Sequence, residues 1–557
     1  MFWQPEPMGA ASVPDSVADH EIVPIRFGMP PNHAPDAATL GFKGYNLWRM
    51  ARLGLPVPHA LVIGTGYCRD HLADPTATNA RLKAALAARL RELETATGLR
   101  FGSARKPLLV SVRSGAPVSM PGMMQTVLNV GLCDATVHGL LRLTGNPRLV
   151  WDLYRRFVQS YAEVVHGCSP APFDEMMRQQ LRRADASDVR ELDFRSLREA
   201  TVAALGIFES QTARSFPQQP AEQLHAAIGA VFASWNGDRA REYRRLKGIA
   251  SDAGTAVTVQ RMVYGNAGGT SGSGVGFSRD PSSGERRLYV DFLFNAQGED
   301  VVSGRHRADE ASSFASLLPE THAEVERAAQ ALEQEFCDAQ EFEFTVQDGQ
   351  LFLLQTRTAK RSGWATLRIA VDMVAEGLIA PSDGLARLES LDLARLSLTK
   401  VNGGEVTTRG VSASVGVAIG EIALDARTAQ RWSQGERPVI LVREFPSTED
   451  IAGIAACAGL LCASGGRTSH AAVVARHLEK VCVVGCEELK IDLVRRHCTL
   501  GSRNFAEGDV ITVDGGSGAV YAGRADVVEE RPAVWLATVE GWRQEASAPA
   551  DLAMPPA

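Results

Sequence analysis

The sequence has no run of about 18 apolar residues, the length that a helix needs to cross a bilayer, and no secretory signal pattern. It also has no excess of basic residues, because the net charge is −7 and the isoelectric point is near 6.0. Nucleic acids and anionic membranes usually bind proteins that carry a basic field. We therefore expect a cytoplasmic protein whose partners include neither a nucleic acid nor a membrane.

The nine cysteines include no pair with the two-residue gap of a zinc ribbon. Cys457 with Cys462, and Cys482 with Cys486, are close enough in sequence to be considered as metal ligands. Small buried residues in strands are the favoured interpretation of both pairs. In the expected compartment the thiols would be reduced.

Hydrophobic periodicity changes several times along the 557 residues, which indicates several domains. Residues from about 135 to 250 have helical spacing, and short strands with glycine-rich turns then lead to a hairpin at Asp348-Gly349. Helical spacing returns after residue 360, and strand-like runs follow. The predicted segments are a loose N-terminal arm (1–37), a first large unit (38–360), a helical connector (361–404), a small α/β domain (405–525) and a C-terminal tail (526–557).

The stretch VSVRSGAPVSMPGMMQTVLNVGL ends a predicted strand at Arg113 and continues into a loop rich in glycine and serine, from Ser114 to Thr126. Backbone N–H groups of such a loop can approach phosphate oxygens, and a neighbouring guanidinium can pair with them in a fork. A surface loop beside an ordinary arginine has the same composition. This stretch alone therefore leaves both interpretations open.

The hairpin EFEFTVQDGQLFLLQTR carries polar side chains on two neighbouring strands. Alternation places Glu341 and Glu343 on one side of the first strand, and Gln355 and Arg357 on one side of the second. Carboxylate and amide oxygens suit a Mg²⁺ ion that bridges nucleotide phosphates, and an arginine can neutralise the transferring group. An exposed polar face is the alternative, and it is disfavoured by the apolar residues in between, Phe342, Phe344, Phe352 and Leu354.

The stretch SGGRTSHAAVVARHLEKVCVVG places His470 at a predicted helix start, after two glycines and before two alanines. These small neighbours leave the imidazole room to meet a large group. A neutral imidazole is a competent nucleophile near pH 7, and the N–H groups of a helix N-terminus would favour its phosphorylated form. A helix-capping or packed histidine is the alternative.

These three stretches, together with GVGFSRDPSSGERRLYVDFLFNAQGEDVV, resemble successive motifs of the pyruvate phosphate dikinase family over roughly residues 38–523. The resemblance implies an α/β and α+β multidomain protein. Its ATP-grasp-type nucleotide-binding unit, with a helical subdomain, would be followed by a small swivelling α/β phosphohistidine domain. In that family the histidine takes a phosphoryl group from ATP through a pyrophosphorylated intermediate, and carries it to a distant acceptor site.

Position by position, the resemblance implies that His470 is the phosphoryl carrier and that Thr468 is the threonine that plant dikinases use for regulation. Lys43 of GFKGYNL matches the family's phosphate-binding lysine, and Arg113 matches the catalytic arginine that holds the triphosphate. The other matches are Gly122 and Thr126 in the loop that covers the phosphates, Gln260 in the strand beside the adenine, Glu343 and Gln355 as ligands of the Mg²⁺-nucleotide, and Arg357 as the catalytic arginine beside them.

The sequence departs from the family pattern at several positions. Arg467 replaces a methionine directly before Thr468, and the other replacements are at Phe42, Gln125 and Glu341. None of them removes a group that the nucleotide chemistry needs. The family also continues into a C-terminal (β/α)₈ barrel of about 250 residues that binds pyruvate or phosphoenolpyruvate, and this sequence stops before it. Rifampin-type phosphotransferases carry an acceptor domain between the two units, and the connector at 361–404 is too short for one.

Three functions remain as hypotheses. The first is an ATP-dependent phosphotransferase that autophosphorylates on His470, releases AMP and passes the phosphoryl group to an unknown small molecule. The second is the subunit of a split dikinase whose separate barrel partner binds pyruvate. The third is a non-catalytic nucleotide-sensing scaffold. Inorganic phosphate or water would be the second substrate of either enzyme, and the dikinase motifs favour phosphate.

Overall fold

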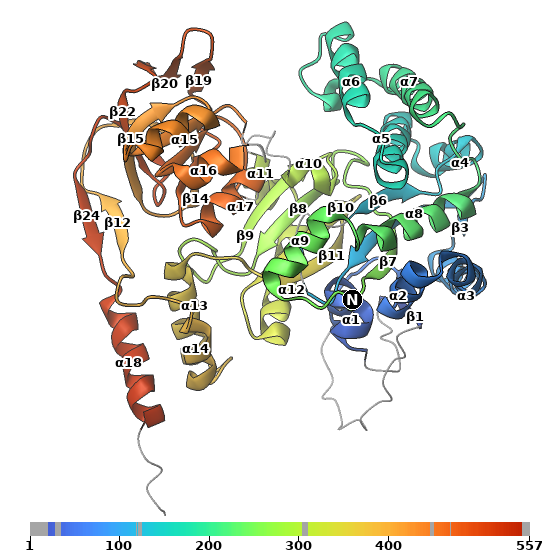
Figure 1. Cartoon of the computed structure of the whole chain (residues 1–557), viewed down its shortest axis with the longest axis horizontal. Helices are drawn as coiled ribbons and strands as arrows, with labels where there is room; N and C mark the ends of the chain where they lie inside the picture. Colours follow the sequence, from blue (N-terminus) through green and yellow to red (C-terminus); the bar gives the residue numbers. More distant parts are fainter. Residues whose placement is uncertain are drawn as a thin grey trace, which may run out of the picture. The chain divides into compact units, whose positions relative to one another are not determined.

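The structure is a computed structural model of the chain, and it describes residues 21–27, 35–118, 120, 125–302, 310–445, 450–467 and 469–547. Within these ranges the side chains of residues 246, 302, 310–312, 470, 471 and 477 are not described. Unit 1 holds the residues up to Val263 together with Phe352–Gln355, and unit 2 holds Tyr264–Leu351 together with the residues from Thr356 onward. Figure 1 labels the elements of both units.

The structure bears on two predictions, those about membrane-spanning helices and about the cysteines. No helix in the described ranges is long and apolar enough to cross a membrane. All nine cysteines are free thiols, and seven of them are buried. The predicted cytoplasmic location stays a prediction.

Unit 1 is built on an antiparallel five-stranded sheet. Its order is β1 (Ile22–Ile25), β2 (Ala60–Ile63), β7 (Ala256–Arg261), β5 (Val110–Gly115) and β6 (Thr126–Val130). Helices α1 (Ala37–Arg52), α2 (Thr65–Ala73) and α3 (Pro75–Thr97) contact this sheet. A short parallel pair, β3 (Arg100–Phe101) and β4 (Pro107–Leu108), follows α3. The apolar runs that predict the strands are therefore buried between helices and sheet.

The helical part of unit 1 contains α4 (Asp134–Thr144), α5 (Pro147–His166), α6 (Ala171–Arg183), α7 (Phe194–Thr212), α8 (Pro220–Ser234) and α9 (Asp238–Lys247), with a 3₁₀ turn at Val189–Glu191. Helix α5 shows why the elements form where they do. Asn146 caps it by accepting from the N–H of Leu149, Pro147 occupies its first turn, and Gly167 ends it in the left-handed conformation.

Unit 2 begins with a four-stranded sheet in the order β11 (Gln350–Thr358), β10 (Gln340–Gln347), β8 (Gly272–Phe277) and β9 (Tyr289–Phe294). Helices α10 (Gly298–Val302), α11 (Glu310–Leu317) and α12 (Pro319–Phe336) belong to the same region. The glycines of β8 make room for aromatic rings: a Cβ on Gly276 would lie 2.4 Å from the ring of Phe342. The aromatic side of β10 is thus packed against the sheet, as its apolar alternation predicts.

The connector forms α13 (Gly363–Ala375) and α14 (Pro381–Leu388). Both helices pack against a helix near the C-terminal end of the chain. Residues 526–557, predicted to be a tail, include β24 (Val527–Glu530) and α18 (Ala533–Ser547). Helix α18 buries Val539 and Trp542 against α13 and α14, and β24 pairs antiparallel with β12 (Leu398–Val401). Within its described residues, the predicted C-terminal tail thus contains a strand and a helix that contact residues far earlier in the chain.

The small α/β domain contains an eight-stranded sheet in the order β13 (Val406–Arg409), β23 (Ala519–Ala522), β22 (Val510–Asp514), β15 (Val417–Ala423), β16 (Val439–Arg443), β17 (Gly459–Cys462), β18 (Val481–Val484) and β14 (Val411–Ser414). From β15 to β18 the neighbours are parallel. Helices α15 (Ala426–Gln434), α16 (Ile451–Ala456) and α17 (His470–His477) connect these strands. A three-stranded sheet of β19 (Leu489–Asp492), β20 (His497–Leu500) and β21 (Arg503–Ala506) completes the domain. The predicted mixed α/β, multidomain fold class is confirmed.

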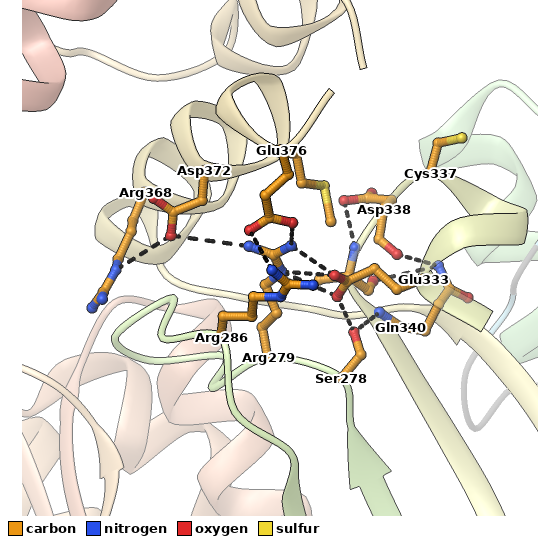
Figure 2. A network of polar contacts seen from close by, with 12 residues as sticks. Ser278, Arg279, Arg286, Glu333, Cys337, Asp338, Gln340, Arg368, Asp372 and Glu376 are labelled. Carbon is orange, nitrogen blue, oxygen red and sulfur yellow. Dashed lines mark hydrogen bonds and ion pairs between the residues drawn. The ribbon is translucent and has the colours of Figure 1, made fainter. Parts of the chain in front are cut away.

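A buried arginine joins α13 to the four-stranded sheet of unit 2 (Figure 2). Arg279 follows β8, and its guanidinium donates to Glu333 of α12 at 2.6 Å and to Glu376, just after α13, at 2.7 Å. The hydroxyl of Ser362 at the start of α13 donates to the carbonyl oxygen of Ser282 at 2.8 Å. The beginning of the connector is therefore attached to the sheet by charged and neutral hydrogen bonds.

Candidate functional site

Helix α1 is interrupted at Gly41, two residues before Lys43. Gly41 has a φ of 66°, and a Cβ at this position would lie 1.6 Å from the carbonyl oxygen of Gly115, so only glycine fits. The next N–H, that of Phe42, donates to the carbonyl oxygen of Ala116 at 2.8 Å. These contacts hold the second part of α1 against the end of β5 and place Lys43 beside Gly115.

Arg113 lies on β5 directly opposite Thr126 of β6 and Thr258 of β7. Directly opposed residues of an antiparallel sheet share one face. The Nη2 atom of Arg113 also lies 3.4 Å from Oε1 of Gln355, to which it donates. The structure thus brings together three predicted residues of unit 1, Arg113, Thr126 and Gln355, whereas Gly122 lies outside the described residues.

The same face of the sheet carries two buried polar side chains, those of Gln260 and Thr258. Gln260 lies opposite Ser111, two residues along β7 from Thr258. Gln260 is only 2% exposed, and among the described residues neither its Nε2 atom nor Oγ1 of Thr258 has a hydrogen-bond partner. Because buried polar atoms are nearly always satisfied, this face is suited to a polar ligand. The sequence analysis missed Thr258, although its alternation with Gln260 in TAVTVQR was a usable signal.

In unit 2, the hairpin of β10 and β11 carries Glu341, Glu343 and Arg357. Arg357 forms an ion pair with Glu341, so the strand that was expected to hold a metal ligand also holds the counter-ion of the arginine. Burial opposes the charged form of Arg357, but the carboxylates of Glu341 and Glu343 outweigh it and raise its pKa. Arg357 is therefore held as a cation in a mostly buried environment.

His470 is the first residue of α17, after the loop 463–469 that leaves the carboxyl end of β17. In parallel α/β sheets, such ends are where ligand-binding loops gather. The side chain of Ser469 caps the helix by accepting from the N–H of Ala472 at 3.4 Å. The predicted helix start is confirmed, while the side chain of His470 and the whole of Thr468 lie outside the described residues.

Arg476, on α17, is a residue of this region that sequence reasoning missed. It is buried, and its guanidinium donates to the carbonyl oxygens of Ala413 and Arg467 at 3.0 Å each. Burial lowers its pKa, and the surrounding acidic groups oppose that effect. Arg476 thereby ties the loop before His470 to β14. In the sequence, an arginine on a short helix is expected to be exposed, so nothing indicated that Arg476 is buried and makes these contacts.

The described residues contain no group of three or more His, Cys, Asp or Glu arranged to hold a metal ion. Glu343 and Gln355 lie on neighbouring strands, β10 and β11, and both supply hard oxygen donors. Magnesium is commonly held by one or two protein oxygens together with substrate phosphates. The donor chemistry therefore fits Mg²⁺ that arrives with a nucleotide, and it does not form a cage for the ion alone.

Comparison with known proteins identifies two domain families. Residues 76–319 match the family "Pyruvate phosphate dikinase, AMP/ATP-binding domain", and residues 435–518 match the family "PEP-utilising enzyme, mobile domain". A pyruvate, phosphate dikinase of Rhizobium meliloti (strain 1021) is 42% identical over 90% of this chain and 58% of its own length. That of Clostridium symbiosum is 40% identical over 89% of the chain and 58% of its own length.

A chloroplastic pyruvate, phosphate dikinase of Flaveria pringlei is 39% identical over 91% of the chain and 53% of its own length. The chain thus spans a little over half the length of these curated relatives. The two matched segments lie in the same order as the two units predicted from sequence, with the nucleotide-binding part first. Residues 76–319 are therefore similar to the pyruvate phosphate dikinase AMP/ATP-binding domain family, and residues 435–518 to the PEP-utilising enzyme mobile domain family.

Proposed function

We propose that this chain is an ATP-dependent, dikinase-type phosphotransferase that autophosphorylates on His470 and releases AMP. The similarity to curated dikinases over about nine-tenths of the chain supports this function. The structural observation that carries it is the face of unit 1 with Arg113, where Gln260 and Thr258 present buried polar atoms that have no partner among the described residues. A nucleotide base and its phosphates would satisfy these atoms and the arginine together.

The chain's own groups account for the first step. A ring nitrogen of neutral His470 attacks the β-phosphorus of ATP, and the new N–P bond forms as the bond from that phosphorus to the α,β-bridging oxygen breaks. AMP leaves with that oxygen, and the histidine carries a pyrophosphoryl group. Inorganic phosphate or water then takes the γ-phosphoryl group, which leaves phosphohistidine. Lys43, Arg113 and Arg357 neutralise the phosphate charge during these transfers.

Magnesium is the implied cofactor, and Glu343 and Gln355 are the residues that would hold it. When bound, the ion would neutralise the phosphate oxygens of ATP. Arg357 remains charged beside Glu341 and Glu343, so it can orient the transferring group. Thr468 is proposed as a modification site, on the resemblance alone.

The final acceptor is either a small molecule or pyruvate bound to a barrel partner. Because the relatives are longer than this chain, the second possibility is kept as the alternative, together with a nucleotide-sensing scaffold. An enzyme and a scaffold differ in one measurable property, the covalent labelling of His470.

The deciding experiment incubates the purified chain with Mg²⁺ and ATP labelled at the β-phosphorus, with and without inorganic phosphate. We expect AMP release and an acid-labile, base-stable label on His470, with pyrophosphate formed when phosphate is the second substrate. His470→Asn should bind ATP with unchanged affinity and take up no label. ATP binding without AMP release or label in the unmodified chain would favour the scaffold and overturn the proposal.

A further inference from the structure

A buried acidic turn lies within unit 2, between β8 and β9. Oδ1 of Asp280 accepts from the N–H groups of Ser282 and Ser283 at 2.8 and 3.1 Å, which fixes the carboxylate in the turn. On the following strand, the hydroxyl of Tyr289 donates to Oδ1 of Asp291 at 2.7 Å. We call these three residues, Asp280, Tyr289 and Asp291, the docking surface. Each of its two carboxylates accepts a hydrogen bond from a residue nearby in the sequence.

Arg467, three residues before His470, lies on this docking surface. Its guanidinium is 3.4 Å from Oδ2 of Asp280 and stacks on the ring of Tyr289 at 4.2 Å. The side chain is only 16% exposed. Burial opposes the ionisation of Asp280, but Arg467 and the two backbone N–H groups outweigh it and lower its pKa. An ion pair shielded from water in this way is screened by salt much less than a surface pair.

The backbone beside Arg467 approaches the docking surface as well. A Cβ on Gly466 would lie 2.9 Å from a carboxylate oxygen of Asp291, so only glycine allows this approach without a shift. Behind the loop, Arg476 donates to the carbonyl oxygen of Arg467 at 3.0 Å and lies over the ring of Phe277 on β8 at 5.9 Å. Residues 466–467 are therefore held both through the side chain of Arg467, which pairs with Asp280, and through its carbonyl oxygen, which accepts from Arg476.

We propose that Arg467 is a positioning residue for the phosphorylation of His470, because it docks residues 464–467 on Asp280 and Tyr289. The loop enters α17 directly at His470, so a fixed Arg467 restricts where the first turn of that helix can lie. The inference rests on the proposed function, since it names the contact that would hold the carrier segment while ATP reacts. Misplacing a reacting group by about 1 Å can cost on the order of 10²-fold in rate.

The chain offers a matched control in Arg287. This guanidinium also lies 3.4 Å from Oδ2 of Asp280, but its side chain is 60% exposed. Exposed ion pairs contribute little, whereas breaking a buried pair is costly. Arg467→Ala should therefore lower the rate constant of His470 labelling at saturating ATP at least about tenfold. Arg287→Ala should change it less than about twofold, and neither change should alter the Kd for ATP.

Two further variants separate positioning from a general loss of stability. Asp280→Asn keeps the oxygen that accepts from Ser282 and Ser283 but removes the charge, so it should slow labelling and make Arg467→Ala nearly without additional effect. Arg467→Lys keeps the charge, and it should restore part of the rate. Raising the ionic strength should slow labelling of the unmodified chain only slightly, because salt screens a buried ion pair much less than an exposed one.

Hydrogen exchange followed by mass spectrometry reads the docking without any reaction. Peptides covering residues 464–476 and 278–291 should lose protection in Arg467→Ala and keep it in Arg287→Ala. Equal labelling rates in Arg467→Ala and the unmodified chain would overturn the positioning role, whatever the exchange result. If the unmodified chain takes up no label, the proposed function and the positioning role both fail, and the exchange comparison alone decides whether the contact exists.

Discussion

Replacing Arg279 by methionine should loosen the attachment of the connector to unit 2. The Arg279 side chain is 0% exposed, and it lies between the carboxylates of Glu333 and Glu376 (Figure 2). Methionine preserves much of the apolar volume but leaves both carboxylates without their shared cation. The variant therefore tests the charge, and only secondarily the packing.

The magnitude follows from the burial of the partners. Removing one member of a buried ion pair typically costs about 3–5 kcal/mol. Glu333 is nearly buried, but Glu376 retains 20% of its side-chain exposure, so water would partly solvate the released charge. We therefore expect the lower end, about 3 kcal/mol, which corresponds to a loss of exchange protection on the order of 100-fold.

Native-state hydrogen exchange of peptides from α12 and α13 measures this opening free energy locally, which suits a chain with more than one unit. Arg286→Met is the control. Arg286 lies 3.5 Å from the same Glu376, but its side chain is 64% exposed, so protection should change by about 0.5 kcal/mol or less. Equal protection in Arg279→Met and Arg286→Met would refute the argument that the buried guanidinium holds the connector.

Two other predictions concern unit 1. Gly41→Ala should weaken ATP binding and lower the thermal stability of the unit, because the new Cβ would overlap the carbonyl oxygen of Gly115 beside Lys43; Gly54→Ala, also at positive φ but with no atom within 4 Å, should leave the ATP Kd unchanged. For Asp152, burial opposes ionisation, but Arg156 and Arg155 outweigh it and hold its pKa well below the ordinary value. Its stabilising effect is therefore present above the unfolded pKa of about 4 and is lost as the pH falls below it. Urea unfolding of α5, followed by exchange, should show a smaller acid-induced loss in Asp152→Asn; an unchanged slope would contradict the assignment.

Local patterns in the sequence were sufficient for the elements whose signals are short-range. The hairpin turn at Asp348-Gly349 is found where predicted, and both turn residues have positive φ, at 52° and 80°. This is the geometry that an aspartate-glycine hairpin turn requires. Backbone preference alone decides such features, so no knowledge of distant residues is needed.

The features that escaped prediction depend on residues that are far apart in sequence. Helix α18 carries Trp535, Leu536, Val539 and Trp542 at helical spacing, a signal that was not used, and the residues that cover it belong to α13 and α14, more than 140 positions earlier. The pairing of Arg467 with Asp280 joins residues 187 positions apart. The sequence identified Arg467 as a departure from the family, but nothing in the sequence indicates which carboxylate it meets.

The same long-range contacts bear on where the small α/β domain can swivel. The connector is flanked by two glycine-containing segments, residues 360–363 and 402–405, where a swing could be absorbed with little steric cost. In the structure, the N–H and hydroxyl of Ser362 donate to the carbonyl oxygens of Pro281 and Ser282, so the first segment is fastened to the sheet of unit 2. Gly403 and Gly404 have φ values of 79° and 101°. They follow β12 after Asn402, and β12 pairs with β24, through which the chain returns from the small α/β domain. The chain enters the small α/β domain after β12 and leaves it before β24, and these two strands are paired. A swing at 402–405 can therefore be absorbed at a few backbone torsions, without breaking the contacts of α13, α14 and α18. The swivel predicted from sequence is therefore best sought beyond β12, at the entrance to the small α/β domain.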